Sequence, residues 1–146
     1  METATPEILL VEDNPGDVLL TREAFNQTKI PCHLSVVGNG AEAIRFLCRQ
    51  GDYGTAPRPD LILLDLHLPR KAGHELLAEI KSDAHLKAIP VVVLTTSVSE
   101  SDIAKAYSLH ANSYIAKPTD LDGLCAVVEA IARFWLQVVV LPPKEC

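Results

Sequence analysis

The sequence predicts an α/β protein built on a doubly wound parallel sheet of five strands. Short apolar runs alternate along the chain with segments of helical periodicity, five of each. The apolar runs are continuous rather than interrupted by polar residues, as is usual for strands that helices cover on both faces. Five such strand and helix pairs, joined by right-handed crossovers, form one open sheet with helices on both sides.

The predicted strands are the apolar runs themselves, at residues 8–11, 34–37, 61–64, 91–94 and 113–116. A polar connection at residues 50–59, which contains proline and glycine, precedes the third strand. Connections of this length are long for a compact domain, so this one is a distinguishing feature of the chain.

Helical periodicity fills the gaps between the strands. The first helix is predicted at about residues 15–28, because Asn14 supplies a cap and the proline that follows suits a first turn. Ser99 is the predicted N-cap of the fourth helix, and the fifth begins near residues 119–120. The apolar positions that mark helices two to five are Ala41, Ile44, Leu47 and Cys48; Leu76, Leu77 and Ile80; Ile103, Ala106 and Tyr107; and Leu124, Val127, Val128, Ile131 and Phe134.

Composition predicts a globular protein of one domain. Of the 146 residues, 48% are apolar and 22% are charged, which argues against disorder. The net charge of -6 argues against direct nucleic-acid binding, which needs clustered Lys and Arg. No apolar run approaches the roughly 20 residues of a membrane span, and the start METATPEILLVEDN lacks the features of a secretory signal. We therefore expect a cytoplasmic protein with no membrane partner.

The cysteines are scattered along the chain and form no CxxC pair. We expect them to be reduced thiols rather than disulfides or ligands of a metal. The four positions are Cys32, Cys48, Cys125 and Cys146.

Carboxylates stand at the ends of two predicted strands. Glu12 and Asp13 follow the first strand, and Asp65 follows the third. In an open parallel sheet, function gathers at the carboxyl ends of the strands, where these three groups would repel one another unless a cation is present. Mg²⁺ suits this arrangement, because it prefers oxygen ligands and is held by one or two carboxylates plus a phosphoryl oxygen. The alternative is a solvated acidic edge of the sheet.

Polar residues also end the fourth and fifth strands. Lys117 can neutralise a carboxylate or a phosphoryl oxygen, or it can be an ordinary surface lysine. Pro118 follows it, and an X-Pro bond can be cis and so re-aim the lysine. Thr95 and Thr96 can donate a hydroxyl hydrogen bond to a phosphoryl oxygen, or they can reflect only the preference of threonine for strands.

Together, Glu12-Asp13, Asp65, Thr95 and Lys117-Pro118 resemble the receiver domain of two-component response regulators. The resemblance extends over about residues 7–134 and includes the segments LLVEDN, DLILLDLHLPRKAG, IPVVVLTTS and SYIAKP. It implies a flavodoxin-like sheet with strand order 2-1-3-4-5, in a receiver domain at residues 1–134. It also implies a phosphoprotein of signal transduction, which takes part in a phosphorelay and is not a turnover enzyme.

The resemblance assigns a chemical role to the acidic positions. Asp65 resembles the phosphoacceptor, a carboxylate nucleophile that takes a phosphoryl group from a histidine kinase. Glu12, Asp13 and Asp65 resemble the side-chain ligands of Mg²⁺ or Mn²⁺. The main-chain carbonyl of His67, two residues past Asp65, resembles a further ligand of the metal, supplied by the backbone.

The resemblance also assigns roles to residues around the acceptor. Lys117 and Thr95 resemble the groups that bind the phosphoryl oxygens, and Thr95 with Tyr114 resembles the pair that switches conformation. The side chains of His67 and Ser97 occupy the positions that modulate hydrolysis of the acyl phosphate. Such roles fit phosphoryl transfer, in which catalysis is mostly positioning and charge neutralisation.

A narrower resemblance concerns the loop at residues 50–59, the LTTS segment and the tail FWLQVVVLPP. These features are similar to the small stand-alone response regulators that serve cyanobacterial and bacterial phytochromes. The similarity implies a light-sensing, phytochrome-type histidine kinase as partner, and a chain with no output domain. It does not identify the downstream protein.

Three other functions are compatible with parts of the pattern. A haloacid-dehalogenase-type phosphatase also uses an aspartate nucleophile and Mg²⁺, but it places a DxD pair at the first strand. A flavodoxin-like nucleotide or flavin binder would carry a Gly-rich phosphate loop after the first strand, and none is present. A receiver-like module that is never phosphorylated would be favoured by loss of Asp13, Asp65 or Lys117, all of which are present.

The C-terminal tail at residues 135–146 is apolar where a solvated terminus would be polar. Large exposed apolar patches usually mark an interface. We therefore expect a homodimer, formed by the side of the domain from the fourth strand to the tail, with the tail against the partner. The alternative is that the tail caps the core of its own domain.

Overall fold

The structure, a computed structural model, describes residues 5–69 and 72–143. One parallel sheet of five strands has the order β2-β1-β3-β4-β5, which confirms the predicted fold. The strands are β1 Glu7–Val11, β2 His33–Val37, β3 Leu61–Leu64, β4 Val91–Thr95 and β5 Ser113–Ala116. The helices that follow them are α1 Pro15–Thr28, α2 Gly40–Leu47, α3 Gly73–Ser82, α4 Glu100–Ser108 and α5 Leu121–Arg133.

Three strands extend one residue beyond the apolar runs that predicted them. β1 and β2 begin at Glu7 and His33, which pair in register. The side chains of these two residues lie 2.8 Å apart, between His33 Nδ1 and Glu7 Oε1. β4 ends at Thr95, which pairs with Ala116 of β5. Polar residues join the strands here because main-chain pairing continues where apolar side chains stop.

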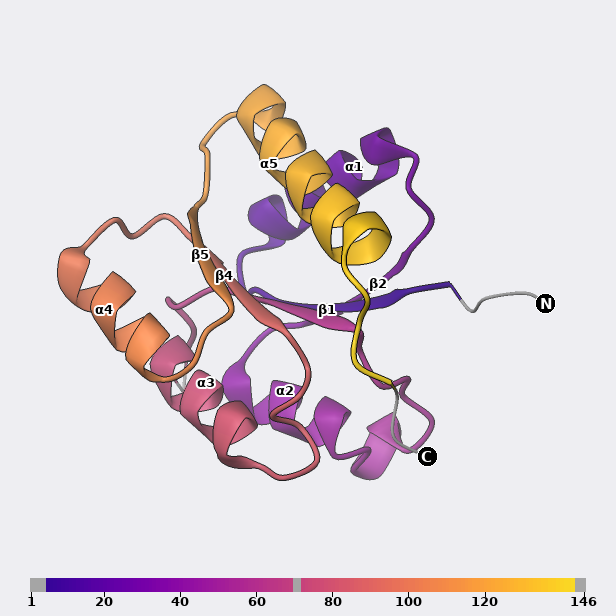
Figure 1. Cartoon of the computed structure of the whole chain (residues 1–146), viewed down its shortest axis with the longest axis vertical. Helices are drawn as coiled ribbons and strands as arrows, with labels where there is room; N and C mark the ends of the chain where they lie inside the picture. Colours follow the sequence, from indigo (N-terminus) through magenta and orange to yellow (C-terminus); the bar gives the residue numbers. More distant parts are fainter. Residues whose placement is uncertain (1–4, 70–71, 144–146) are drawn as a thin grey trace.

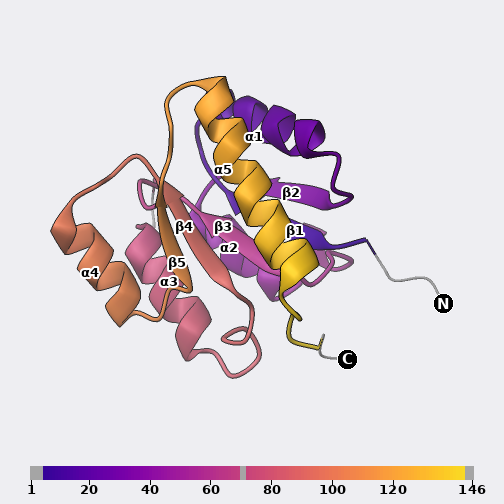
Figure 2. The ribbon, with the colours of Figure 1, turned by 45° about the horizontal axis from the view of Figure 1, so that its top comes forward.

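Helices cover both faces of the sheet (Figures 1 and 2). α1 and α5 lie side by side on one face, and α2, α3 and α4 lie on the other. Side chains of the strands alternate between two apolar cores, so that Leu9 and Ile62 face one core and Ile8 and Leu61 face the other. The central strands β1, β3 and β4 are therefore buried on both sides, as their continuous apolar runs predicted, whereas the edge strands β2 and β5 are only partly buried.

Polar side chains cap three helices at the positions that the sequence predicted as helix starts. Asn14 Oδ1 accepts a hydrogen bond from the Asp17 main-chain N–H at 3.0 Å, at the start of α1. Ser99 Oγ accepts from the Asp102 N–H at 3.3 Å, at the start of α4. Asp120 caps α5 in the same way. These bonds satisfy N–H groups that have no partner within the helix.

The long connection before β3 is anchored on α2 rather than free. It contains a 3₁₀-helix at Gly51–Tyr53. The Tyr53 ring centroid lies 5.4 Å from that of Phe46, and the Tyr53 hydroxyl donates to Glu42 Oε2 at 2.6 Å.

The end of the chain differs from the simple tail that the sequence predicted. α5 ends at Arg133, one residue before the predicted Phe134, and the chain continues in a π-helical segment, Phe134–Val138. Trp135 and Leu136 then pack against the core beneath α5. The last two described residues, Pro142 and Pro143, line a small cleft together with residues 58–60 and 88–90. The tail thus follows its own domain along the edge where β3 and β4 begin.

Cys32, Cys48 and Cys125 are free thiols, as expected, and Cys146 lies outside the described residues. Within residues 5–69 and 72–143, no helix is both long enough and apolar enough to cross a bilayer.

Candidate functional site

The polar residues predicted from the strand ends meet at one edge of the sheet. Main-chain hydrogen bonds that continue past the strands hold three of them in place. The Glu12 N–H donates to Val37 O at 3.0 Å, the Asp65 N–H to Val11 O at 3.1 Å, and the Lys117 N–H to Thr95 O at 2.7 Å. Each residue is therefore positioned by two neighbouring strands, which is a rigid support for a chemical site.

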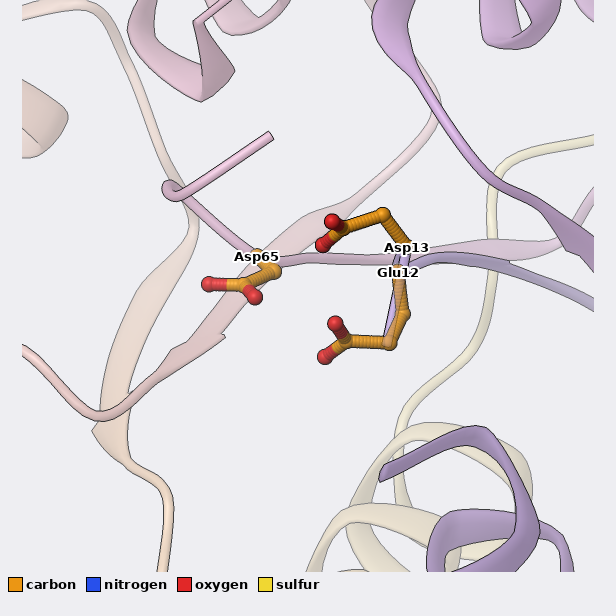
Figure 3. A group of neighbouring side chains, drawn as sticks. All are labelled: Glu12, Asp13 and Asp65. Atoms are coloured by element: carbon orange, nitrogen blue, oxygen red, sulfur yellow. The ribbon is translucent and has the colours of Figure 1, made fainter. Parts of the chain in front are cut away.

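Three carboxylates form the acidic part of this site. One oxygen from each of Glu12, Asp13 and Asp65 lies within 4.8 Å of the other two, and the side chains of Glu12 and Asp13 extend toward Asp65 (Figure 3). Glu12 is only 3% exposed and Asp65 8% exposed, whereas Asp13 is exposed to solvent. Three hard oxygen donors with one side open to water suit Mg²⁺ or Mn²⁺, which retain bound waters. The donor set therefore fits the divalent metal that the sequence predicts.

Lys117 is buried among these carboxylates. Its Nζ lies 2.5 Å from Glu12 Oε1 and 3.8 Å from Asp65 Oδ2. Burial raises the pKa of the Glu12 carboxyl, although the hydrogen bond from Lys117 acts in the opposite direction. Burial also opposes the charge of Lys117, but the hydrogen bond to Glu12 and the nearby carboxylates outweigh it, so the pKa of Lys117 is raised. These contacts favour the charged form of the lysine beside Asp65.

The Lys117–Pro118 bond is trans, since no cis peptide bond occurs in the part of the chain that the structure describes. A cis bond is therefore not what directs the lysine. Its main-chain hydrogen bond to Thr95 and its side-chain contacts with carboxylates do so instead.

Thr95 contacts the predicted acceptor directly. The fully buried Thr95 hydroxyl donates to Asp65 Oδ1 at 2.9 Å. The His67 main-chain N–H donates to the same oxygen at 3.2 Å, while the His67 side chain is exposed. Neighbouring Thr96 is exposed as well, so of the two threonines only Thr95 faces the site. Two donors on Oδ1 hold the Asp65 carboxylate in one orientation.

Tyr114 and Ser97 are hydrogen-bonded to each other, and Ser97 is also hydrogen-bonded to α4. The Tyr114 hydroxyl donates to the main-chain carbonyl of Ser97 at 3.0 Å. The Ser97 hydroxyl donates to Asp102 Oδ2 at 2.6 Å, in the first turn of α4. Tyr114 is thus hydrogen-bonded to the loop after β4, and the Ser97 hydroxyl of that loop is hydrogen-bonded to Asp102 of α4.

Sequence reasoning missed two residues of the site. Asp17 of α1 has its Oδ2 3.5 Å from Lys117 Nζ, so it is a further carboxylate around the lysine. Gly73, the first residue of α3, packs against the loop that follows Asp65. A Cβ atom on Gly73 would lie 2.5 Å from Leu66 Cα and 2.7 Å from Asp65 O. The available signals were an acid in a capped first turn and a glycine at the start of a helical pattern.

Comparison with known proteins gives a family match over most of the chain. The family model described as "Response regulator receiver domain" matches residues 8–129. The curated protein Response regulator Rcp1 of Synechocystis sp. is 49% identical over 135 residues, which are 92% of this chain and 92% of Rcp1.

Solved structures agree with the sequence comparison. The structure of the phosphorylated cyanobacterial phytochrome response regulator RcpA superposes with a TM-score of 0.91 at 50% identity, over 96% of this chain and all of RcpA (100%). The Mn²⁺-bound form of response regulator Rcp1 superposes with a TM-score of 0.88 at 48% identity, over 94% of this chain and 99% of Rcp1.

Proposed function

The chain belongs to the response regulator receiver family, and on that premise we propose that Asp65 is its phosphoacceptor. One observation carries the proposal. The Asp65 carboxylate lies within reach of two other carboxylates, a buried lysine and a buried threonine hydroxyl at the same time. A metal ion, a fixed cation and a hydroxyl donor are the three kinds of group that neutralise and orient a transferring phosphoryl group.

A divalent ion, proposed to be Mg²⁺, would be held by Glu12, Asp13 and Asp65 and by the main-chain carbonyl of His67. Bound there, the metal supplies positive charge to the phosphoryl oxygens and relieves the repulsion among the carboxylates. Asp13 is exposed, so a hydrated ion can reach the site from solvent.

In the proposed transfer, an Asp65 carboxylate oxygen forms a P–O bond while the P–N bond of a phosphohistidine breaks. The imidazole nitrogen leaves with the electron pair of the broken bond. Lys117 and Thr95 would then each bind a phosphoryl oxygen, Lys117 by charge and Thr95 by its hydroxyl proton. Catalysis would come from positioning and charge neutralisation, which is the pattern of phosphoryl transfer in general.

Signalling would follow from the same contacts. Thr95 Oγ1 now bonds to Asp65 Oδ1 directly, at 2.9 Å. On phosphorylation, Thr95 would turn toward a phosphoryl oxygen, and Tyr114 would move with the loop after β4. Both arrangements of this surface would exist without phosphorylation, and phosphorylation would shift the population toward the second one. His67 and Ser97 are the proposed modulators of acyl-phosphate lifetime.

The acceptor role can be told apart from catalytic turnover by acetyl phosphate in Mg²⁺. A receiver takes up at most one acid-labile phosphoryl group per chain and responds to beryllofluoride. A phosphatase would release phosphate over many turnovers, and a silent module would do neither. We expect the receiver result, so the chain is a proposed phosphoacceptor and not a turnover enzyme.

Mg²⁺ is expected to raise the melting temperature at neutral pH, because it binds a site that the unfolded chain lacks. Asp13→Asn should reduce that rise to less than half, since it removes one carboxylate ligand. Differential scanning fluorimetry with and without Mg²⁺ measures both proteins. Asp122→Asn, an exposed acid in the first turn of α5, is the matched control and should respond as the wild type does. Equal responses of Asp13→Asn and wild type would place the ion elsewhere.

The proposed partner is a phytochrome-type histidine kinase in the cytoplasm. Support comes from the likeness to Rcp1 and to RcpA, which is named as a phytochrome response regulator. The proposed organisation of these residues is a receiver at residues 1–134, followed by an apolar tail at residues 135–146. A phosphotransfer profile against candidate kinases would identify the donor.

A second copy of the chain is the proposed cover for an apolar hollow beside the edge strand β5. The hollow has a volume of about 530 Å³ and is lined in part by Ile115, Ile131, Phe134 and Trp135. Phe134 is 48% exposed, and further along the tail Val138 is 65% and Val140 is 98% exposed. Part of the tail therefore caps its own domain, and part of it leaves apolar surface for a partner.

We expect the wild-type chain to sediment as a dimer at micromolar concentration, with Phe134→Glu shifting it toward the monomer. A buried glutamate at the interface would lack a partner. Leu19→Glu, at an exposed apolar position on α1, is the control and should sediment as the wild type does. A wild-type monomer, with and without phosphorylation, would contradict the proposed dimer.

A further inference from the structure

The N-terminus of α4 is capped through an extra hydroxyl. In a capping box, an acidic side chain at the third helical position accepts directly from the N-cap N–H. Here Ser97 stands between the two groups. The Ser99 N–H donates to Ser97 Oγ at 3.3 Å, and Ser97 Oγ donates its proton to Asp102 Oδ2 at 2.6 Å. The Asp102 carboxylate thus uses the one hydroxyl proton of Ser97, and that hydroxyl cannot donate elsewhere at the same time.

The loop that carries Ser97 joins β4 to α4, and its β4 end contacts the phosphoacceptor site. Thr95, the last residue of β4, donates directly to Asp65. A direct bond leaves no phosphoryl oxygen between them, so this is the arrangement of the unmodified site. Only Thr96 therefore separates Thr95, which would change partner on phosphorylation, from Ser97, which is bonded to Asp102 of α4. The Tyr114 hydroxyl bonds to the carbonyl of that serine.

α4 is weakly held by the core, which makes its end contacts important. Ala106 is its one fully buried residue, whereas α3 buries Gly73, Leu76, Leu77 and Ile80. Figure 1 shows α4 at the margin of the sheet, beyond β5. A contact from α3 adds to the attachment, since His74 Nε2 lies 3.2 Å from the main-chain carbonyl of Asp102. Segments with little buried apolar surface are those that shift most easily between arrangements.

We propose that Asp102 is a positioning residue for the phosphoryl site. Its carboxylate holds Ser97, and through Ser97 it holds the loop after β4 in the unphosphorylated arrangement. This inference rests on the proposed phosphoacceptor function of Asp65. A contact present in only one of two arrangements opposes the change to the other, so removing it favours the phosphorylated form.

The test is binding of beryllofluoride, a phosphoryl analogue, in saturating Mg²⁺, followed by ¹⁹F NMR of the bound species. Asp102→Ala should lower the half-saturating beryllofluoride concentration by about three- to tenfold, which is within the range expected for the net contribution of one typical intramolecular hydrogen bond. Ser97→Ala should lower it in the same direction. Asp122→Ala, which removes an exposed acid from the first turn of α5, should leave it unchanged.

The double variant Ser97→Ala, Asp102→Ala distinguishes positioning from general loosening of α4. If Asp102 acts through Ser97, the double variant should bind as Ser97→Ala does, because the shared contact can be lost only once. An unchanged concentration in Asp102→Ala would overturn the inference, and so would an equal effect of Asp102→Ala with and without Ser97. If the wild type itself does not bind beryllofluoride, the proposed acceptor function fails first.

Discussion

Asp65→Asn is expected to reduce phosphorylation by labelled acetyl phosphate to background while leaving the fold intact. The amide nitrogen cannot form the acyl phosphate, and the amide oxygen can still accept the hydrogen bonds from Thr95 and the His67 N–H. The substitution also removes one of three crowded negative charges. Acid-labile label per chain, measured after gel filtration, gives the result. The melting temperature without Mg²⁺ should stay the same or rise.

Asp122→Asn is the control for this experiment, because it makes the same chemical change at an exposed position in the first turn of α5. It should take up label as the wild type does. If Asp65→Asn took up as much acid-labile label as the wild type, Asp65 would not be the phosphoacceptor. If Asp65→Asn took up a reduced but measurable amount of label, Asp13 would be an alternative acceptor. The double variant Asp13→Asn, Asp65→Asn would then lose the remaining label.

Gly73→Ala is expected to destabilise the protein strongly, because the added methyl group has no space. An added Cβ would meet main-chain atoms at 2.5 Å and 2.7 Å, in Leu66 and Asp65. Main-chain atoms cannot rotate aside as a side chain can, so the loop after Asp65 or the start of α3 must shift. Overpacking of this kind lowers the free energy of unfolding by about 1–3 kcal/mol, and sometimes by more.

The displaced loop carries Leu66 and His67, so Gly73→Ala should also weaken the Mg²⁺-dependent rise in melting temperature. Urea unfolding with and without Mg²⁺ measures both effects. Gly38→Ala is the matched control, since an added Cβ there meets no atom within 4 Å. It should unfold at nearly the wild-type urea concentration. Equal stability of the two variants would show that the loop after Asp65 accommodates a Cβ.

Most of the fold could be predicted from the sequence because it depends on short-range patterns. The continuous apolar runs predicted five strands to within one residue at each end, as at Glu7 and Thr95. Ser99 and the residues near Asp120 marked helix starts because a side-chain cap is a contact over three positions. The predicted end of the fifth helix was one residue too late, because apolar Phe134 continues the helical pattern although the backbone changes there to a π-helical turn.

The acidic cluster was predictable for a related reason. Parallel strands end at one edge of a sheet, so residues that follow different strands must meet there. Glu12, Asp13 and Asp65 needed no further information, and Thr95 and Lys117 joined them by the same rule. The sequence by itself thus determined the fold and which polar residues gather at the carboxyl edge of the sheet.

Tertiary structure alone decided which of these residues touch. Lys117 bonds to Glu12, 105 positions away, and also approaches Asp17, which no local pattern connects to it. The direction of the Ser97 hydroxyl toward Asp102, the close approach of Gly73 to Asp65 and the path of the tail were likewise settled by packing. The physical reason is that periodicity and capping depend on residue type over a few positions. Contacts between distant segments depend instead on how whole helices seat on the sheet, to within fractions of an ångström.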